Sequence, residues 1–568
     1  MVPDPEPIAQ ERCRLAWETA YSTEPAARAF GYADGGSMTS RAKLLAVVVL
    51  VAGSIVLSLP GQARTLRWAA RGDMQTTDPH SQNEGTTNNI NSLVYDTLVQ
   101  RDKDLNLEPA LAESWQLINP TTWRVKLRAG VKFHDGTPFT ADDVVFSYER
   151  ARSTSSQFRP YANAAGIPRK IDDLTVEFTT DGPNPTELWH WATIFIMSKT
   201  WCEKNRATRP QNYAQKEDMI TARQANGTGA YVLKTREPDV KTVLAKNPEW
   251  WGIKTGLFSG NADEVIYLPI GNDATRLAAL VSGEVDLITD LPPQDVPRLK
   301  QNPNVKVLEG TENRIVFIAM DQSRDELLYS SIKGRNPFKD RRVRQALYQA
   351  IDIEAIRTSI MRGLSTPTGA LLQSAAQSTP DLERRLPYDK AKAKQLLTEA
   401  GYPDGFEVTL DCPNNRYVND EKICQALSAM WAQIGVTVKV NAMPRATYFP
   451  KLEKFDTSMY MFGWGANGST DGIFILQPVL ATNDGKGDGD QNYGRFSNAK
   501  LDELTARIKI ELNPEQRLEE IRAALAAHNA EINDIPLHRQ VIPWAARANV
   551  IAPHRADNHM IAYRVSIN

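Results

Sequence analysis

LAESWQLINPTTWRVKLRAGVKFHDGTPFTADDVVFSYERA, residues 111–151, is the stretch of the sequence that decides the fold. Apolar and basic side chains alternate over residues 123–128, which is typical of a half-buried strand. HDGTP at residues 134–138 is a turn cluster, and Thr140 with Asp143 three residues later indicates the start of a helix. The stretch contains no nucleophile motif, metal-ligand set or phosphate-binding loop. It therefore predicts a structural unit and gives no sign of catalysis.

Further along the chain, helical and strand patterns alternate, as they do in α/β proteins. Residues 419–434 have apolar side chains at i, i+3, i+4, i+7, i+8 and i+11, and Gly435 ends this predicted helix. Residues 338–351 and 389–400 predict two more helices, each with an aspartate at its start. A mature chain of about 500 residues is too long for one hydrophobic core, so two or three domains are expected.

Residues 38–63 have the three parts of a secretory signal. Arg41 and Lys43 form a short basic region, residues 44–59 are an apolar run, and small residues follow at 61–63. An uncleaved membrane anchor is the alternative, but the run is shorter than the roughly 20 residues that span a bilayer. We therefore expect cleavage of this segment.

Residues 1–37, ahead of that signal, are mixed and charged, whereas a signal normally has its basic region close to the first residue. We interpret 1–37 as an extension that results from a misplaced start, with Met38 as the real initiator and a mature chain that begins near Arg64.

The positions of the cysteines bear on the cellular compartment, and the net charge bears on the kind of partner. No cysteine directly follows the apolar run, so we expect a free secreted protein and no lipid anchor. Beyond the leader the chain has Cys202, Cys412 and Cys424. An oxidising compartment permits a disulfide, and Cys412–Cys424, the pair closest in sequence, is favoured; three buried thiols are the alternative. The formal net charge is −2 and no Lys/Arg run occurs, so no nucleic-acid partner is expected.

Residues 111–151 resemble, nearly word for word, the signature of the peptide/nickel-type (family 5) extracellular solute-binding proteins that serve ABC importers. Five other segments resemble the pattern of the same family. They are GTGAYVL at 227–233, NPEWWG at 247–252, FKDRRVRQALYQAID at 338–352, AKQLLTEAGYPDGF at 393–406 and FGWGANGSTDG at 462–472. Each segment alone is weak, whereas together they are specific and cover almost the whole mature chain.

The resemblance implies an α/β fold with two lobes joined by a hinge, a type II, cluster C-like periplasmic binding protein. A third subdomain is inserted in lobe I. The expected boundaries are 64–99, 223–312 and 536–568 for lobe I, 100–222 for the inserted subdomain and 313–535 for lobe II. The hinge strands are expected near 315–319 and 535–538.

The resemblance also implies capture without catalysis. The protein would be the periplasmic substrate-binding component of an ABC importer. It would close its lobes on a short peptide or peptide-like molecule and deliver it to permease subunits with their ATPase. We expect a monomer, no cofactor and no metal, since no HExxH motif or histidine pair at ligand spacing occurs. Because family members also bind nickel chelates, haem, opines and sugars, the fold does not choose the ligand. A secreted hydrolase of peptides or glycans and a signalling receptor are the alternatives.

In relatives that bind peptides, the Trp and Asp of a GWxAD-like motif meet the ligand backbone and its α-ammonium. Trp464 matches the Trp, whereas Asn467 stands at the position of the Asp. An amide does not supply the negative charge that an ammonium needs in a desolvated cleft. Asp471 would substitute if the glycine-rich loop turns it inward; otherwise the ligand has no free α-amine. A turn-shaping role for Asn467 and Asp471 is the alternative.

DCPNNRYVND at residues 411–420 is the second candidate segment. Arg416 is predicted to clamp a carboxylate or phosphate in a bidentate manner, Tyr417 to stack on the ligand or donate a hydrogen bond to it, and Asn415 to line the same site. The helix amino terminus that follows favours anions. The alternative is a surface loop in which Arg416 forms a surface ion pair.

Overall fold

The computed structural model describes residues 63–568. The predicted extension and residues 38–62 of the predicted signal lie outside the described residues. Within the described part, no helix has the length and apolar character needed to cross a bilayer.

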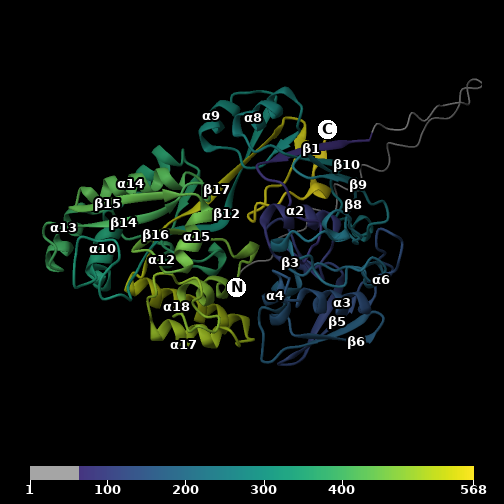
Figure 1. The fold of residues 1–568 in the computed structure, drawn as a ribbon, viewed down its shortest axis with the longest axis horizontal. Coiled ribbons are helices and arrows are strands. Elements are labelled where there is room, and N and C mark those ends of the chain that lie inside the picture. The colour runs from purple at the N-terminus through teal and green to yellow at the C-terminus, as the bar shows by residue number, and fades with distance from the viewer. Residues whose placement is uncertain (1–62) are drawn as a thin grey trace, which may run out of the picture. The chain divides into compact units, whose positions relative to one another are not determined.

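A single mixed sheet runs through both lobes (Figure 1), in the order β15-β14-β16-β12-β17-β11-β1-β10-β9-β8. Its long central strands, β12 (Val305–Met320) and β17 (Asp534–Arg547), pair with each other antiparallel. Lobe II is built on β14 (Phe406–Pro413), β15 (Val436–Met443) and β16 (Met459–Trp464). Lobe I is built on β1 (Thr65–Ala70), β8 (Tyr231–Glu237), β9 (Lys241–Lys246), β10 (Glu264–Pro269) and β11 (Leu287–Ile288). β13 (Ser365–Pro367) adds to β17.

The segments predicted as hinge strands lie within β12 and β17, the two strands that connect the lobes. The mixed sheet with helices on its faces is the two-lobe α/β fold that the sequence predicted. The residue boundaries of the lobes stay a prediction.

Lobe II is covered by helices on both faces of its sheet because alternate residues of each strand point to opposite sides. Val316, Ile318 and Met320 of β12 pack with α10 (Arg341–Gln349), α13 (Lys390–Glu399) and α14 (Asp420–Ala432). Phe317 and Ala319, one residue out of phase, pack with α15 (Arg445–Glu453), α17 (Ala499–Ile508) and α18 (Pro514–Glu531). The sheet is therefore buried on both sides.

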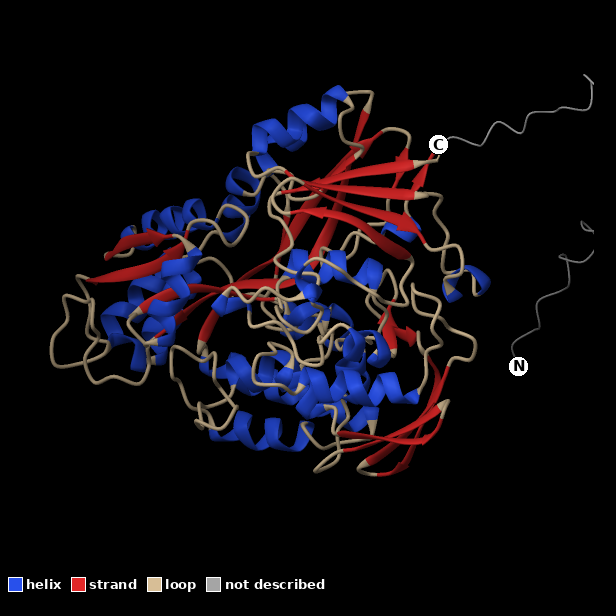
Figure 2. Cartoon of the chain, turned by 45° about the vertical axis from the view of Figure 1, so that its right-hand side comes forward, coloured by secondary structure: helices blue, strands red, loops and turns tan. Residues whose placement is uncertain are grey.

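The quoted stretch, residues 111–151, forms two of the four strands of a second sheet in lobe I, of order β4-β5-β7-β6 (Figure 2). Its strands are β4 (Ala112–Asn119), β5 (Thr122–Leu127), β6 (Ile167–Asp172) and β7 (Thr175–Thr179). The predicted alternating strand is β5, and the predicted helix start is the capping box of α3 (Ala141–Ala151), in which Thr140 N donates to Asp143 Oδ2 at 2.9 Å. Both expectations are confirmed.

Smaller elements complete lobe I. They are α2 (Gly85–Val94), the β2–β3 hairpin (Val99–Arg101 and Leu107–Pro109), α4 (Arg159–Ala164), α5 (Glu187–Trp191), α6 (Lys199–Lys204), α7 (Trp251–Lys254), α8 (Asp273–Ser282) and α9 (Val296–Leu299). One continuous hydrophobic core joins the second sheet to the main sheet, since Val125 and Phe178 belong to the same buried cluster as Leu66 and Tyr231.

A fully buried ion pair holds α3 against the start of lobe I. Arg150 donates to both carboxylate oxygens of Asp78, at 2.8 and 2.6 Å, and neither side chain is exposed. Burial opposes the charge on Asp78, but Arg150 outweighs it and lowers the pKa of Asp78 to about 2. The pair therefore contributes stability above the ordinary aspartate pKa, and this contribution is lost as the pH falls towards 2.

We expect Arg150→Met to lower the free energy of unfolding by about 3–5 kcal/mol, because it leaves the buried Asp78 carboxylate without its counter-charge. The loss should shrink as the pH falls from 5 towards 2 and Asp78 takes up a proton. Urea denaturation followed by circular dichroism measures both effects. Arg152→Met, on the same helical turn, removes one hydrogen bond to Ala162 O and should cost about 1 kcal/mol. Equal losses for the two variants would contradict the ion-pair argument.

Candidate functional site

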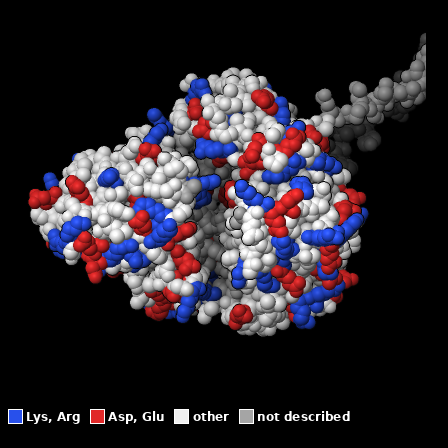
Figure 3. All heavy atoms as spheres, in the orientation of Figure 1, with Lys and Arg blue, Asp and Glu red and all other residues white. Residues whose placement is uncertain are grey.

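A cleft of about 2050 Å³ lies between the lobes, beside the β12–β17 pair. Figure 3 shows it as the furrow between the left and right bodies. Its walls carry aromatic side chains from lobe I (Trp68, Trp189) and from lobe II (Phe462, Trp464, Phe474), together with arginines and amides. Drug-sized ligand pockets span about 300–1,000 Å³, so this cleft has room for a ligand larger than a dipeptide.

An irregularity in the β12–β17 ladder turns β12 side chains into the cleft. The register shifts between Thr311 and Ile315, and the intervening residues 312–314 line the cleft. Such a shift re-aims side chains and bends the strand. Arg314 Nε then donates to Glu312 Oε1 at 3.1 Å, and Gln540 Nε2 donates to Glu312 Oε2 at 2.9 Å. The charge of Arg314 is thus matched by Glu312.

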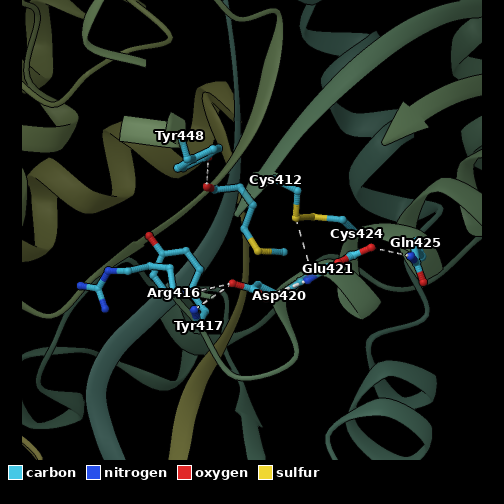
Figure 4. The surroundings of a disulfide bond; sticks show 9 residues. Cys412, Arg416, Tyr417, Asp420, Glu421, Cys424, Gln425 and Tyr448 are labelled. Atoms are coloured by element: carbon cyan, nitrogen blue, oxygen red, sulfur yellow. Dashed lines mark hydrogen bonds between the residues drawn. A yellow bond between two sulfur atoms is a disulfide. The ribbon is translucent and has the colours of Figure 1, made fainter. Parts of the chain in front are cut away.

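The segment between β14 and α14 brings Arg416 to the lobe II wall. Asp420 Oδ2 accepts the backbone N–H of Arg416 at 2.9 Å and that of Tyr417 at 3.0 Å, which folds the segment into a tight turn. Figure 4 shows the Arg416 guanidinium directed away from this carboxylate. It lies 5.4 Å from the Tyr417 ring centroid and forms no hydrogen bond or ion pair with the residues that the structure describes. The positive charge of Arg314, together with burial, lowers the pKa of Arg416.

The two neighbours of Arg416 have structural partners. Tyr417 is buried, and its hydroxyl donates to Gly463 O at 3.4 Å. A Cβ on Gly463 would lie 2.6 Å from Tyr417 Cε1, so only glycine lets the ring pack against β16. Asn415 Oδ1 accepts the backbone N–H of Arg445 at 2.8 Å at the start of α15. Both residues line the cleft, but these polar atoms are already engaged.

Trp464 lines the cleft at the end of β16. Its indole N–H donates to Phe474 O at 2.5 Å, and its ring stacks on Phe462 with centroids 6.1 Å apart. The ring therefore remains as a surface for a ligand, while the N–H is used within lobe II. The side chain of Asn467 lies outside the described residues; its backbone belongs to the 3₁₀ turn Ala466–Gly468.

The orientation of Asp471 differs from the sequence-based hypothesis, in which its side chain turns into the cleft. Its carboxylate forms a bidentate ion pair with Arg517 of α18, in which Arg517 Nη2 donates to Asp471 Oδ1 at 2.8 Å, and Oδ1 also accepts the N–H of Ile473. Asp471 is buried and is absent from the cleft wall. The expectation that Asp471 binds a ligand ammonium is therefore corrected, because Arg517 already neutralises the Asp471 carboxylate.

Sequence reasoning missed a contact across the cleft. The Phe474 ring of lobe II lies edge-on to Trp189 and His190 of lobe I, with centroid distances of 6.4 and 6.1 Å. Burial lowers the pKa of His190 to about 4, so its ring is uncharged at neutral pH and packs as an aromatic surface. Nothing in the local sequence around Phe474 signals this contact, since the partners lie in the other lobe.

We expect Phe474→Ala to shift the protein towards an open conformation, because it removes the aromatic contact across the cleft. The radius of gyration of the ligand-free protein in small-angle scattering should rise. Phe449→Ala serves as the control, since Phe449 lines the lobe II wall and its ring contacts are with lobe II residues. A Phe474→Ala profile identical to wild type would rule out this role.

A disulfide closes the loop that carries Arg416. Cys412, near the end of β14, is bonded to Cys424 in α14 (Figure 4). Cys202 is a buried free thiol. The bond ties together the two elements from which the Arg416 turn projects.

We expect the double change Cys412→Ala and Cys424→Ala to lower the free energy of unfolding by about 3 kcal/mol, the entropy of closing a loop of this length in the unfolded chain. Chemical denaturation with and without reductant measures it. Reductant should destabilise the wild type and leave the double variant unchanged; a wild type insensitive to full reduction would contradict the expectation.

Comparisons with known proteins agree on one family. The model of the bacterial extracellular solute-binding proteins, family 5, matches residues 106–487. Heme-binding protein A of Haemophilus influenzae is 30% identical over 473 residues, which covers 78% of this chain and 82% of that protein. Glutathione-binding protein GsiB of Escherichia coli is 27% identical over 498 residues, which covers 84% and 89%.

Solved structures show the same fold. HbpA2 from Haemophilus parasuis superposes with a TM-score of 0.73 at 24% identity, covering 89% of this chain and 100% of that one. The periplasmic binding protein DppA from Helicobacter pylori, in complex with the peptide STSA, has a TM-score of 0.70 at 23% identity, covering 89% and 98%.

Proposed function

The chain belongs to the bacterial extracellular solute-binding proteins, family 5, and from this membership we propose that it is the periplasmic substrate-binding component of an ABC importer. It captures a short peptide or peptide-like molecule by lobe closure and delivers it to permease subunits with their associated ATPase. It acts as a monomer and releases its ligand chemically unchanged. We further propose the lobe boundaries predicted from the sequence.

The observation that carries this proposal is the cleft itself. Its walls come from two lobes that share only the central strands of one sheet, so a ligand that contacts both walls is favoured in the closed form. The two relatives reported above, heme-binding protein A and glutathione-binding protein GsiB, support a small organic ligand. Trp464 offers a ring face to such a ligand, and Arg416 offers a guanidinium that no carboxylate of the described chain neutralises.

The test is binding without turnover. Native mass spectrometry of the protein from its own periplasm identifies a copurified ligand, and short peptides including glutathione are then added one at a time. A true ligand at 100 times its dissociation constant should stabilise the protein by about 2.7 kcal/mol and reduce its radius of gyration. Chromatography of the released ligand should return an unchanged molecule. Release of a cleaved product would instead support a hydrolase, and no binding by any peptide would refute the proposal.

Arg416→Ala should weaken binding of a carboxylate-bearing ligand by at least about 30-fold, because it removes a charged hydrogen-bond donor from a desolvated site. Titration calorimetry measures the loss. Arg357→Ala is the matched control, since Arg357 belongs to the same lobe, is 39% exposed, pairs with Glu354 and lies outside the cleft. The melting temperature of both ligand-free variants should stay near wild type. Unchanged affinity in Arg416→Ala would exclude the clamp.

A further inference from the structure

Two arginines on the lobe II wall have no carboxylate partner among the described residues. Arg416 lies close to Arg314 and Arg445, and Glu312 is the acidic side chain that acts on it. Glu312 is already bound by Arg314 and Gln540. The guanidinium of Arg445, like that of Arg416, has no hydrogen-bond or ion-pair partner in residues 63–568.

Asp420 does not neutralise this wall either, because it accepts three backbone N–H groups, those of Arg416, Tyr417 and Glu421. Two guanidinium groups, those of Arg416 and Arg445, therefore face the cleft without a carboxylate.

Lobe I has a smaller pocket of about 110 Å³ beside the cleft. The pocket and the cleft share Asn83, Asn88, Thr193 and His559 as lining residues, so the two spaces adjoin. A site needs about 10–15 Å³ for one water molecule, so this pocket has room for a carboxylate group. Its basic side chains are Arg101, Arg555 and His559.

Arg101 is the unneutralised group in this pocket. Its Nη1 donates to Ala192 O at 2.9 Å and its guanidinium lies 5.4 Å from the centre of the Trp189 ring. Its Nε is buried and has no hydrogen-bond partner. The nearby carboxylate, Asp557, is held by Arg555, whose Nε donates to Asp557 Oδ1 at 3.1 Å. Burial, the largest influence, lowers the pKa of Arg101 to about 10, so it remains charged at neutral pH.

The open edge of Arg101 is the edge through which Arg67 binds a carboxylate in this protein. Arg67 uses its Nε and Nη2 to hold Asp286, at 2.9 and 2.6 Å. The same edge of Arg101, Nε and Nη2, makes no hydrogen bond to the described chain. A planar guanidinium edge of this kind matches a carboxylate in a bidentate manner.

The acidic side chains of the cleft are mostly engaged. Asp273 pairs with Arg71, and Asp557 pairs with Arg555. Glu84 and Asp290 accept backbone N–H groups, and Glu421 accepts a hydrogen bond from Gln425. Asp490 remains at the exposed rim. Arg416 and Arg445 on the lobe II wall, and Arg101 in the adjoining pocket of lobe I, are therefore the arginines lining these two spaces that have no carboxylate partner in the described chain.

We propose that the ligand is a diacid, a peptide-like molecule with two carboxylates, one held by Arg416 and Arg445 of lobe II and the other by Arg101 of lobe I. This inference rests on the proposed function and names its ligand class. Each carboxylate binds a different lobe, so both are engaged only when the lobes are closed, and a diacid stabilises the closed form more than a monoacid does.

The first experiment uses the unaltered protein with glutathione, its two monoethyl esters, its diethyl ester and the neutral peptide Gly-Gly-Gly. Each ester removes one negative charge with little change of shape. Titration calorimetry should give at least tenfold weaker binding for each monoester than for glutathione, and no measurable binding for the diester. Small-angle scattering should show full closure with glutathione alone.

The second experiment assigns each carboxylate to its wall. Arg101→Gln should weaken glutathione at least tenfold and leave one monoester unchanged, while Arg416→Ala should do the same for the other monoester. Damage to the fold would instead weaken all probes alike. Arg101→Lys keeps the charge without the two-nitrogen edge and should recover only part of the affinity. Arg128→Gln is the matched control, because Arg128 also packs on a Trp ring, that of Trp251, and donates to a backbone carbonyl, that of Ala110, but lies outside both pockets.

The outcomes separate the two proposals. If Gly-Gly-Gly or the diester binds as tightly as glutathione, or if neutral peptides bind and glutathione does not, the diacid inference is wrong while the proposed function stands. If both arginine variants lose the same monoester, the assignment to two walls is wrong. If no peptide binds in any arm, the proposed function fails and the diacid inference fails with it.

Discussion

The antiparallel pairing of β12 with β17 is the interaction on which the rest of the structure depends. These two strands belong to both lobes, and their ladder extends from Val305 paired with Arg547 to Ala319 paired with Asp534. If each lobe had its own sheet, only a flexible linker would join the two lobes. Because the lobes share strands, the strands fix which face of one lobe lies opposite which face of the other. The shift in register after Thr311 has a second consequence, because it places Arg314 and its neighbours in the cleft.

Three arginines of the cleft and its side pocket have no ion-pair partner in the part of the chain that the structure describes: Arg416 and Arg101 are half-buried, and Arg445 is exposed. Elsewhere in the same chain, Asp78 neutralises Arg150 and Asp471 neutralises Arg517. Arg344 is also buried, but backbone carbonyls are its hydrogen-bond partners. Arg416, Arg445 and Arg101 have no such carboxylate among the described residues. Three such arginines around one cleft and its side pocket are most simply explained by binding, since local inconsistencies of this kind concentrate at functional sites.

The sequence predicts local structure well here and long-range partners poorly. Alternation over residues 123–128 predicted β5, the pair Thr140 and Asp143 predicted the start of α3, and helical spacing predicted α14, because each signal lies within a few neighbouring residues. The partner of Asp471 lies 46 residues away, and the packing of α18 determines it. Arg445 and Arg101 carry no local motif either. They matter because no carboxylate of the described residues pairs with them, and only the three-dimensional structure shows this.

The two kinds of contact across the cleft act in opposite directions when no ligand is bound. The Phe474 ring against Trp189 and His190 favours closure, because it buries apolar surface. The unneutralised arginines oppose closure, since closure removes water from a guanidinium that has no counter-charge, and this costs free energy. A ligand carboxylate supplies the missing counter-charge and leaves the aromatic contact intact. The affinity for the ligand then depends on the balance of these contacts in the empty protein as well as on the contacts with the ligand, because the apparent dissociation constant scales inversely with the population already able to close.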